Sequence, residues 1–120
     1  MLKLMRWAEV ENESLGPMLG RQFISGDHIT LARFVLGKGA KVARHTHEHE
    51  QFAWVMQGAL KFLLPGREIV VRAGEVLCIP PDTPHEAEAL EDTIDIDVFS
   101  PARADWVAKD DAYLRDSTFD

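Results

Sequence analysis

The sequence contains one cysteine, Cys78, and no apolar run long enough to cross a membrane. A single cysteine cannot form an intrachain disulfide bond. The segment EVLCIP around it predicts a buried strand, in which the thiol packs as a small hydrophobic group. A bilayer span needs about 20 consecutive apolar residues. We therefore expect a protein that has no internal disulfide and does not act in a membrane.

Basic residues are also scarce, because 13 Lys and Arg stand against 20 Asp and Glu, for a formal charge of −7. Nucleic-acid-binding proteins concentrate Lys and Arg on one face, so we expect no DNA or RNA partner. The first residues, MLKLMRWAEVENES, are interrupted by charges and lack the apolar core and cleavage site of a signal peptide. These features predict a cytoplasmic protein.

The chain of 120 residues is long enough for one domain, which we place over residues 1–120. Apolar residues recur at a period of two in short runs separated by glycine and proline, a pattern typical of β-sandwiches and barrels. The predicted strands span residues 31–36, 51–57, 59–64, 68–72, 75–80 and 93–99. We therefore expect a barrel over about residues 17–100.

The tail, about residues 101–120, has a different pattern. It begins with Pro101, after which Trp106, Val107, Tyr113 and Leu114 follow at helix-like spacings. One or two short turns of helix packed on the barrel are expected.

The segment HTHEHEQ, residues 45–51, places histidines on alternate positions. In an unbroken strand, His45, His47, His49 and Gln51 would lie on one face. Neutral imidazole is a common ligand for zinc, copper, nickel and iron, and two alternate histidines can hold an ion from one side. An exposed strand end rich in His and Glu has the same pattern, so this segment alone leaves both interpretations open.

Two longer segments resemble the paired motifs of small single-domain cupins. GAKVARHTHEHEQFAWVMQG, residues 39–58, is similar to the first motif, and GEVLCIPPDTPHEAEA, residues 74–89, to the second. The resemblance implies an all-β fold, the double-stranded β-helix or jelly-roll barrel, with a short C-terminal helical tail. It also implies one divalent transition metal ion per chain, held by His45, His47, Gln51 and His85, with His49 outside the ligand set.

The chain departs from the family pattern at three positions. Gln51 stands where most cupins have glutamate, Asp82 replaces a glycine and Ala89 replaces an asparagine. Aspartate can serve turn geometry, so Asp82 is tolerable. A neutral amide leaves the charge of the ion uncompensated, which favours an anionic substrate. The amide also favours nickel, zinc, copper or iron, because manganese prefers a carboxylate ligand. The sequence does not identify which of these metals the native protein binds, and manganese stays among the candidates.

The ligand set predicts which faces of two strands point inward. If Gln51 faces the interior, Phe52, Trp54 and Met56 face outward. In the last strand the inward face would carry Asp95, Asp97 and Phe99, and the outward face Ile94, Ile96 and Val98, although isoleucines face the core of an average sheet. Monomers rarely expose such contiguous apolar surface. We therefore expect a homodimer that buries these outward side chains by two-fold packing.

The segment DVFSPARADW, residues 97–106, carries a narrower resemblance. It is similar to the tail of cupins from pectin and alginate breakdown, which open 4,5-unsaturated monouronates into linear keto sugars. The resemblance implies that Asp97 is a catalytic acid and base, that Phe99 lines the substrate pocket, and that Arg103 is catalytic and binds the carboxylate of an anionic sugar substrate. The alternatives are a solvated strand residue for Asp97 and a surface ion pair for Arg103, with Asp105 or Glu88.

Two other functions fit the same residues. Three histidines holding iron with open positions could activate oxygen, as in an iron-dependent dioxygenase-type cupin. A non-catalytic protein could use the metal only to anchor a small molecule such as a sugar. Iron content and oxygen consumption would identify the former, and the absence of turnover the latter.

Overall fold

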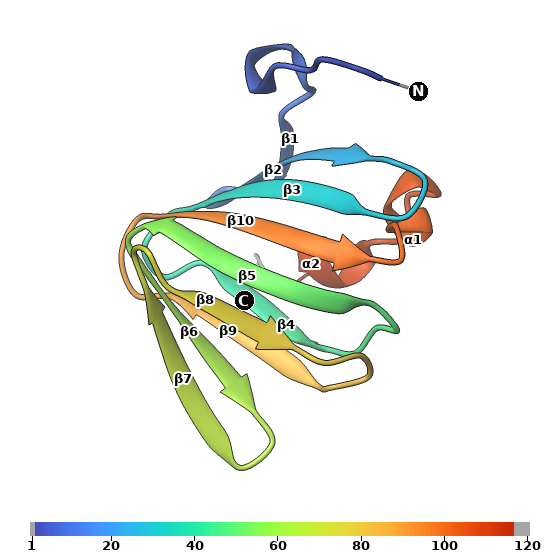
Figure 1. Ribbon diagram of the computed structural model, residues 1–120. Helices are drawn as coiled ribbons and strands as arrows, with labels where there is room; N and C mark the ends of the chain where they lie inside the picture. The colour runs from blue at the N-terminus through green and yellow to red at the C-terminus, as the bar shows by residue number, and fades with distance from the viewer. Residues whose placement is uncertain (1, 117–120) are drawn as a thin grey trace.

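The computed structural model describes residues 2–116 and consists mainly of β-strands (Figure 1). The strands are β1 (Glu13–Gly16), β2 (Leu19–Ser25), β3 (Thr30–Leu36), β4 (Lys41–His45), β5 (Glu50–Gln57), β6 (Ala59–Leu64), β7 (Arg67–Arg72), β8 (Val76–Ile79), β9 (His85–Ala89) and β10 (Thr93–Ser100). A 3-10 turn, η1 (Trp7–Glu9), precedes them, and two short helices follow, α1 (Ala104–Val107) and α2 (Ala112–Asp116).

The strands form two antiparallel sheets. The six-stranded sheet has the order β1-β2-β3-β10-β5-β8, and the four-stranded sheet has the order β4-β9-β6-β7. Strand β10, close to the C-terminus, lies between β3 and β5 in the middle of the larger sheet (Figure 1). The expected all-β architecture with a short helical tail is confirmed, and each of the six predicted strands is present with ends within one residue of the prediction.

Two tight turns depend on glycine. Gly66, in the Pro65-Gly66 turn that joins β6 to β7, has φ +75°, as the Pro-Gly pair predicts. Gly58, between β5 and β6, has φ +90°, and a Cβ there would overlap the carbonyl oxygen of Asp92. A larger residue at Gly58 would therefore push β5 away from the loop before β10.

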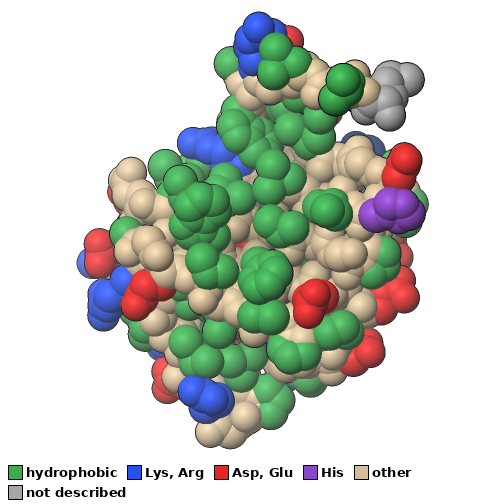
Figure 2. All heavy atoms as spheres, in the orientation of Figure 1, with side chains coloured by type: hydrophobic (Ala, Val, Ile, Leu, Met, Phe, Trp, Pro, Cys, Tyr) green, Lys and Arg blue, Asp and Glu red, His purple; other side chains and the backbone are tan. Residues whose placement is uncertain are grey.

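The predicted inward and outward faces of β5 and β10 are confirmed. Gln51, Ala53 and Val55 are buried, whereas Phe52, Trp54 and Met56 are 44%, 43% and 47% exposed. On β10 the buried residues are Asp95, Asp97 and Phe99, and the partly exposed ones are Ile94, Ile96 and Val98. Figure 2 shows hydrophobic side chains gathered on the face where β3, β10, β5 and β8 lie in Figure 1.

Cys78 is exposed, so the prediction of a buried thiol is wrong. Strand β8 pairs with β5 in a register that places Cys78 opposite Phe52. Paired residues point to the same side of a sheet, so Cys78 follows Phe52 outward. The inward residue next to it is Ile79, which is 1% exposed.

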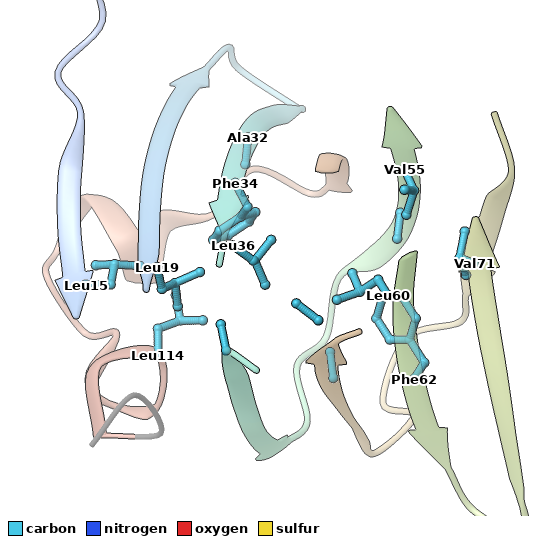
Figure 3. Packing of buried hydrophobic residues seen from close by; sticks show 14 of the residues in the cluster. Leu15, Leu19, Ala32, Phe34, Leu36, Val55, Leu60, Phe62, Val71 and Leu114 are labelled. Carbon is cyan, nitrogen blue, oxygen red and sulfur yellow. The ribbon is translucent and has the colours of Figure 1, made fainter. Parts of the chain in front are cut away.

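The hydrophobic core fills the space between the two sheets (Figure 3). It takes Phe34 and Leu36 from β3, Leu60 and Phe62 from β6, and Val71 from β7. The C-terminal tail adds the buried side chains of Trp106 and Leu114. Burial of each large side chain of this kind contributes about 1.5–3 kcal/mol. Among residues 2–116, no helix has the length and apolar character that a membrane crossing requires.

Candidate metal centre

HTHEHEQ does not form one strand. Strand β4 ends at His45 and β5 begins at Glu50, with a loop between them. His45 pairs directly with His85, the first residue of β9, because β4 and β9 are neighbours in the smaller sheet. His47 lies in the loop, and Gln51 lies on β5 in the larger sheet. The predicted ligands therefore come from both sheets, at the end of the barrel where the sheets meet.

The three histidines converge on one point. One nitrogen from each of His45, His47 and His85 lies within 4.8 Å of the others. The ring centroids are 4.2 Å apart for His45 and His85 and 5.1 Å apart for His47 and His85. The backbone N–H of Asp82 donates to the carbonyl oxygen of His47 over 2.8 Å and so holds the loop. Asp82 has φ +60°, the left-handed conformation for which glycine is favoured at this position.

Backbone hydrogen bonds orient two of the rings. Nδ1 of His45 lies 2.8 Å from the carbonyl oxygen of Ala43, and Nδ1 of His85 lies 2.8 Å from that of Thr83. A carbonyl only accepts, so in both rings Nδ1 carries the proton and Nε2 keeps its lone pair. Nε2 of His85 is buried and has no hydrogen-bond partner among the described residues. Such an orphaned lone pair fits a metal ligand.

The histidines are held in the neutral form. Burial, followed by repulsion from His85, lowers the pKa of His45 to about 3. Burial, followed by the positive charge of Arg103, lowers the pKa of His47 to about 4. The pKa of His85 is also lowered, mainly by burial. Metal ions bind the neutral imidazole, so the site is prepared for a cation at neutral pH.

Gln51 joins this cluster to a buried carboxyl group. Its Oε1 lies 3.1 Å from Nε2 of His47, and its Nε2 donates to Oδ2 of Asp97 over 3.3 Å. Three imidazoles and an amide oxygen fit one divalent transition metal ion, whose identity stays open because such ligands accept several metals.

His49 lies beside the cluster rather than in it. The candidate group contains His45, His47 and His85 but not His49. His49 is 6% exposed, and its ring centroid is 5.2 Å from that of His47 and 6.3 Å from that of Phe99. It therefore packs beside His47 and Phe99, outside the group of three histidines.

A cavity of about 50 Å³ extends from the histidines into the barrel. Its walls include His45, His85 and Gln51 together with the three residues of the predicted reaction site, Asp97, Phe99 and Arg103. All six therefore border one space, although Phe99 and Arg103 reach it from β10 and from the start of the tail.

Asp97 is not a solvated strand residue. It is 5% exposed, and its Oδ1 has no hydrogen-bond partner among the described residues. Burial raises the pKa of Asp97 well above its ordinary value, and the neighbouring carboxyl of Asp95 raises it further, against the lowering effects of Arg103 and Gln51. A buried carboxyl group with a raised pKa is a stronger base when ionised and a candidate proton donor when neutral.

Arg103 is buried rather than on the surface. It is 1% exposed, and its guanidinium lies 4.7 Å from the ring centre of Phe99 and 4.4 Å from that of Trp106. Its Nε and Nη2 donate to Asp105 over 2.9 and 2.7 Å, and Nη2 also donates to the hydroxyl of Tyr113 over 2.9 Å. Asp105 thus occupies the Nε–Nη2 edge of the guanidinium, which could otherwise hold a substrate carboxylate through two hydrogen bonds. Nη1 takes part in none of these three bonds.

Sequence reasoning missed contacts made by the tail. The ring of Tyr113 lies 4.5 Å from that of His45, so the tail covers one side of the cluster. Buried Arg21 bonds Glu13 at 3.0 Å and Asp111 at 2.7 Å, which ties the tail to β1 and β2. No local pattern links residues so far apart, so no sequence signal pointed to these pairs.

Comparisons with known proteins agree with this geometry. Residues 32–100 match the family model described as a cupin domain. The chain is 30% identical over 98 residues to "Pectin degradation protein KdgF" of Dickeya dadantii, an alignment that covers 79% of this chain and 89% of that protein.

A solved structure gives the same picture. The structure of KdgF from Halomonas sp. superposes with a TM-score of 0.82 at 29% identity, covering 88% of this chain and 99% of that one. The chain is also 27% identical over 110 residues to 3-hydroxyanthranilate 3,4-dioxygenase of Neurospora crassa. That alignment covers 88% of this chain but spans only 61% of the dioxygenase.

Proposed function

The chain belongs to the cupin family, and from that premise we propose that it is a metal-dependent enzyme that opens 4,5-unsaturated monouronates into linear keto sugars. The relative from Dickeya dadantii is named for pectin degradation. The tail of this chain resembles that of cupins from pectin breakdown, which open such sugars. The residues of the tail resemblance, Asp97, Phe99 and Arg103, border the same cavity as His45 and His85.

One divalent ion would be held by His45, His47, Gln51 and His85. When bound, it supplies a Lewis acid that stabilises negative charge developing on a substrate oxygen. Because these four ligands are neutral, they leave the positive charge of the ion available to an anionic substrate. Arg103 adds a second positive charge on the wall of the same cavity.

Asp97 is proposed to move the protons. Ring opening removes the proton of the anomeric hydroxyl and breaks the bond between C1 and the ring oxygen, which leaves an aldehyde at C1 and an enolate at C5. Protonation of C4 then gives the ketone, so the product is an isomer of the substrate. Asp97 accepts the first proton and donates one to carbon, a role that suits a buried carboxyl group.

Arg103 and Phe99 are proposed to position the sugar. Because Asp105 occupies Nε and Nη2, the substrate carboxylate would bind Nη1, and Asp105 would hold the guanidinium still. Phe99 offers an apolar surface to the sugar ring and is itself packed against both Arg103 and Trp106, at 4.7 and 5.1 Å from its ring centre.

The contacts of Gln51 carry this proposal. Its amide oxygen faces His47 and its amide nitrogen donates to Asp97, so one side chain links the ligand set to the acid-base group. A solely structural metal site would not require, next to its ligands, a buried carboxyl group whose Oδ1 has no partner among the described residues.

The test combines metal analysis with an activity assay. Protein purified without an affinity tag should contain about one transition metal ion per chain and should remove the ultraviolet absorbance of an unsaturated monouronate. Asp97→Asn should keep the metal and lose turnover about 1,000-fold, within the range of general acid-base effects. The control, Glu88→Gln on the outer face of β9, should match the wild type. Retained turnover in Asp97→Asn would refute the role of Asp97.

A second candidate is an iron-dependent dioxygenase, which the similarity to 3-hydroxyanthranilate 3,4-dioxygenase favours. It requires iron in the purified protein and oxygen consumption with an aromatic substrate such as 3-hydroxyanthranilate. Oxygen uptake without loss of uronate absorbance would select this function over ring opening.

The outward apolar face is proposed to form a homodimer. Phe52, Trp54 and Met56 stand in a row on β5, and Val76 on β8 beside them is 55% exposed. A second copy presents the same face, so a two-fold axis would bring identical apolar surfaces together.

A further inference from the structure

Strand β10 places its inward side chains in order along the cavity. Phe99 lies opposite Gln51, Asp97 opposite Ala53, and Asp95 opposite Val55. Since a strand advances about 3.4 Å per residue, Asp95 lies about 7 Å beyond Asp97 and about 14 Å beyond Phe99, measured along the strand. Asp95 therefore stands at the inner end, away from the histidines.

Asp95 is an unusual occupant of that position. It is 2% exposed, and its Oδ1 has no hydrogen-bond partner among residues 2–116. Its cross-strand neighbours are Phe34 and Val55, which offer no donor from their side chains. Burial raises the pKa of Asp95 to about 6, and a hydrogen bond with the carboxyl group of Asp97 lowers it in part. That carboxyl group is the one polar partner among the described residues that shifts the pKa of Asp95.

Several side chains of the cavity wall are apolar. Asp95 borders the cavity together with Phe34, Leu36, Leu60 and Phe62. A valine or leucine would suit these neighbours better than a carboxyl group, because an unpartnered buried polar atom costs free energy. Groups retained at such a cost are concentrated where they serve function.

Small residues lie beside Asp97. Its partners on the two neighbouring strands are Ala32 and Ala53, and Ala87 borders the cavity from the other sheet. Each of these presents only a methyl group. Because Asp95 borders the same cavity as His45 and His85, a ligand held at these histidines would meet Oδ1 of Asp95 at the far end of that cavity.

We propose that Asp95 forms an inner binding subsite that takes one hydroxyl group of the substrate, at the end of the cavity away from the metal ligands. The inference rests on the proposed function and adds a specificity-determining residue to it. A hydroxyl group suits Asp95 because it both donates and accepts, so it can pair with the carboxyl in either protonation state. A second carboxylate would be repelled, and an apolar group would leave Oδ1 unpaired.

The test measures binding of hydroxyl-deleted probes. Saturated galacturonate, which lacks the reactive double bond, and a set of analogues each lacking one hydroxyl are titrated into metal-loaded protein by calorimetry. In the wild type, one deletion should weaken binding at least about 10-fold, the effect of an unpaired buried polar group. Asp95→Val should bind the parent sugar weaker by a similar factor and should no longer distinguish that analogue.

Asp95→Asn provides the conservative comparison, since its amide can still pair with a hydroxyl. It should retain part of the discrimination that Asp95→Val loses, with unchanged metal content in both. If Asp95→Val still distinguishes the same analogue, the subsite is refuted. A fall in kcat that is equal for all unsaturated substrates, without a change in KM, also refutes it, because Asp95 would then act through Asp97.

Turnover of the unsaturated monouronate by the wild type is measured in parallel. Turnover without any effect of Asp95 on discrimination overturns the subsite and leaves the proposed function standing. Discrimination without turnover supports the subsite and refutes the proposed reaction. If the wild type neither binds nor converts uronates, both are wrong.

Discussion

The two sheets of the barrel differ in which side chains they bury. In the four-stranded sheet most inward residues other than His45 and His85 are apolar, among them Leu60, Phe62 and Ala87, and the outward ones include Lys61 and Glu88. In the six-stranded sheet the middle strands β5 and β10 bury polar side chains among their inward residues and expose apolar ones.

On β5 and β10 the inward row includes Gln51, Asp95 and Asp97, and the outward row includes Phe52 and Trp54. The smaller sheet follows the usual rule that one face packs on the core and the other is solvated. Strict alternation in a strand couples its two faces. On β5 and β10, polar residues of the candidate site point inward and apolar residues point outward. The same two strands therefore form both the site and the apolar outer surface.

The largest expected effect comes from His85, a predicted metal ligand on the smaller sheet. His85→Ala should reduce bound metal from about one ion per chain to under about a tenth, because removal of a ligand costs more than the 10- to 100-fold loss typical of its supporting contacts. Glu86→Ala, the next residue and outward-facing, should keep the metal. Elemental analysis after dialysis measures both, and full metal content in His85→Ala would contradict the site.

The outward face of the larger sheet should control assembly. Trp54→Lys places a charge in the apolar row and should convert dimers into monomers, which halves the mass measured by light scattering during size exclusion. Glu86→Lys changes the outward face of the smaller sheet and should leave the dimer intact. If Trp54→Lys stays dimeric, the apolar row is not the interface.

The tail is attached to the edge of the larger sheet through a buried ion pair. Asp111→Asn removes the negative charge from the 2.7 Å ion pair, while Glu13 still pairs with Arg21, and should lower the free energy of unfolding at pH 7 by about 2 kcal/mol. Burial raises the pKa of Asp111, but hydrogen bonds from Arg115 and Arg21 outweigh it, so the pKa is lowered in the folded state.

The sign of the pH effect follows from that lowered pKa. A carboxyl of this kind contributes stability above its ordinary pKa of about 4 and loses it as the pH falls through the folded value. Urea unfolding at pH 7, 5 and 3 should therefore show the wild type approaching Asp111→Asn toward pH 3. A difference that stays constant with pH would exclude an ionic origin.

The smallest effect is expected on the outer face of the smaller sheet. Lys61 lies 3.8 Å from Glu68 and 3.5 Å from Glu88, in partly exposed ion pairs. Lys61→Ala should change the free energy of unfolding by less than about 0.5 kcal/mol, since exposed pairs contribute little. A loss above 1.5 kcal/mol would mean that both outer faces carry structural contacts and would weaken the contrast between the sheets.

Much of the fold follows from local pattern. Six strands were predicted because apolar residues alternate in them, whereas β1, β2, β4 and β9 were not. In β4 and β9 the one large aliphatic residue is Val42, so their apolar pattern is weak. The faces of β5 and β10 followed once Gln51 was placed inside, because a period of two leaves one choice per strand. Cys78 was misplaced because the short β8 carries apolar residues on both faces, so only its pairing with β5 decides its side.

The sequence by itself determined the alternating strands, the spacing of His45, His47, Gln51 and His85, and the grouping of Asp95 with Asp97, because these depend on neighbours along one chain segment. Only the tertiary structure decided which groups those side chains meet. Asp105 holds Arg103, the tail covers His45, and Oδ1 of Asp95 has no hydrogen-bond partner in the part of the chain that the structure describes. Such partners come from segments distant in the chain, and their distances are set by how the two sheets and the tail pack together.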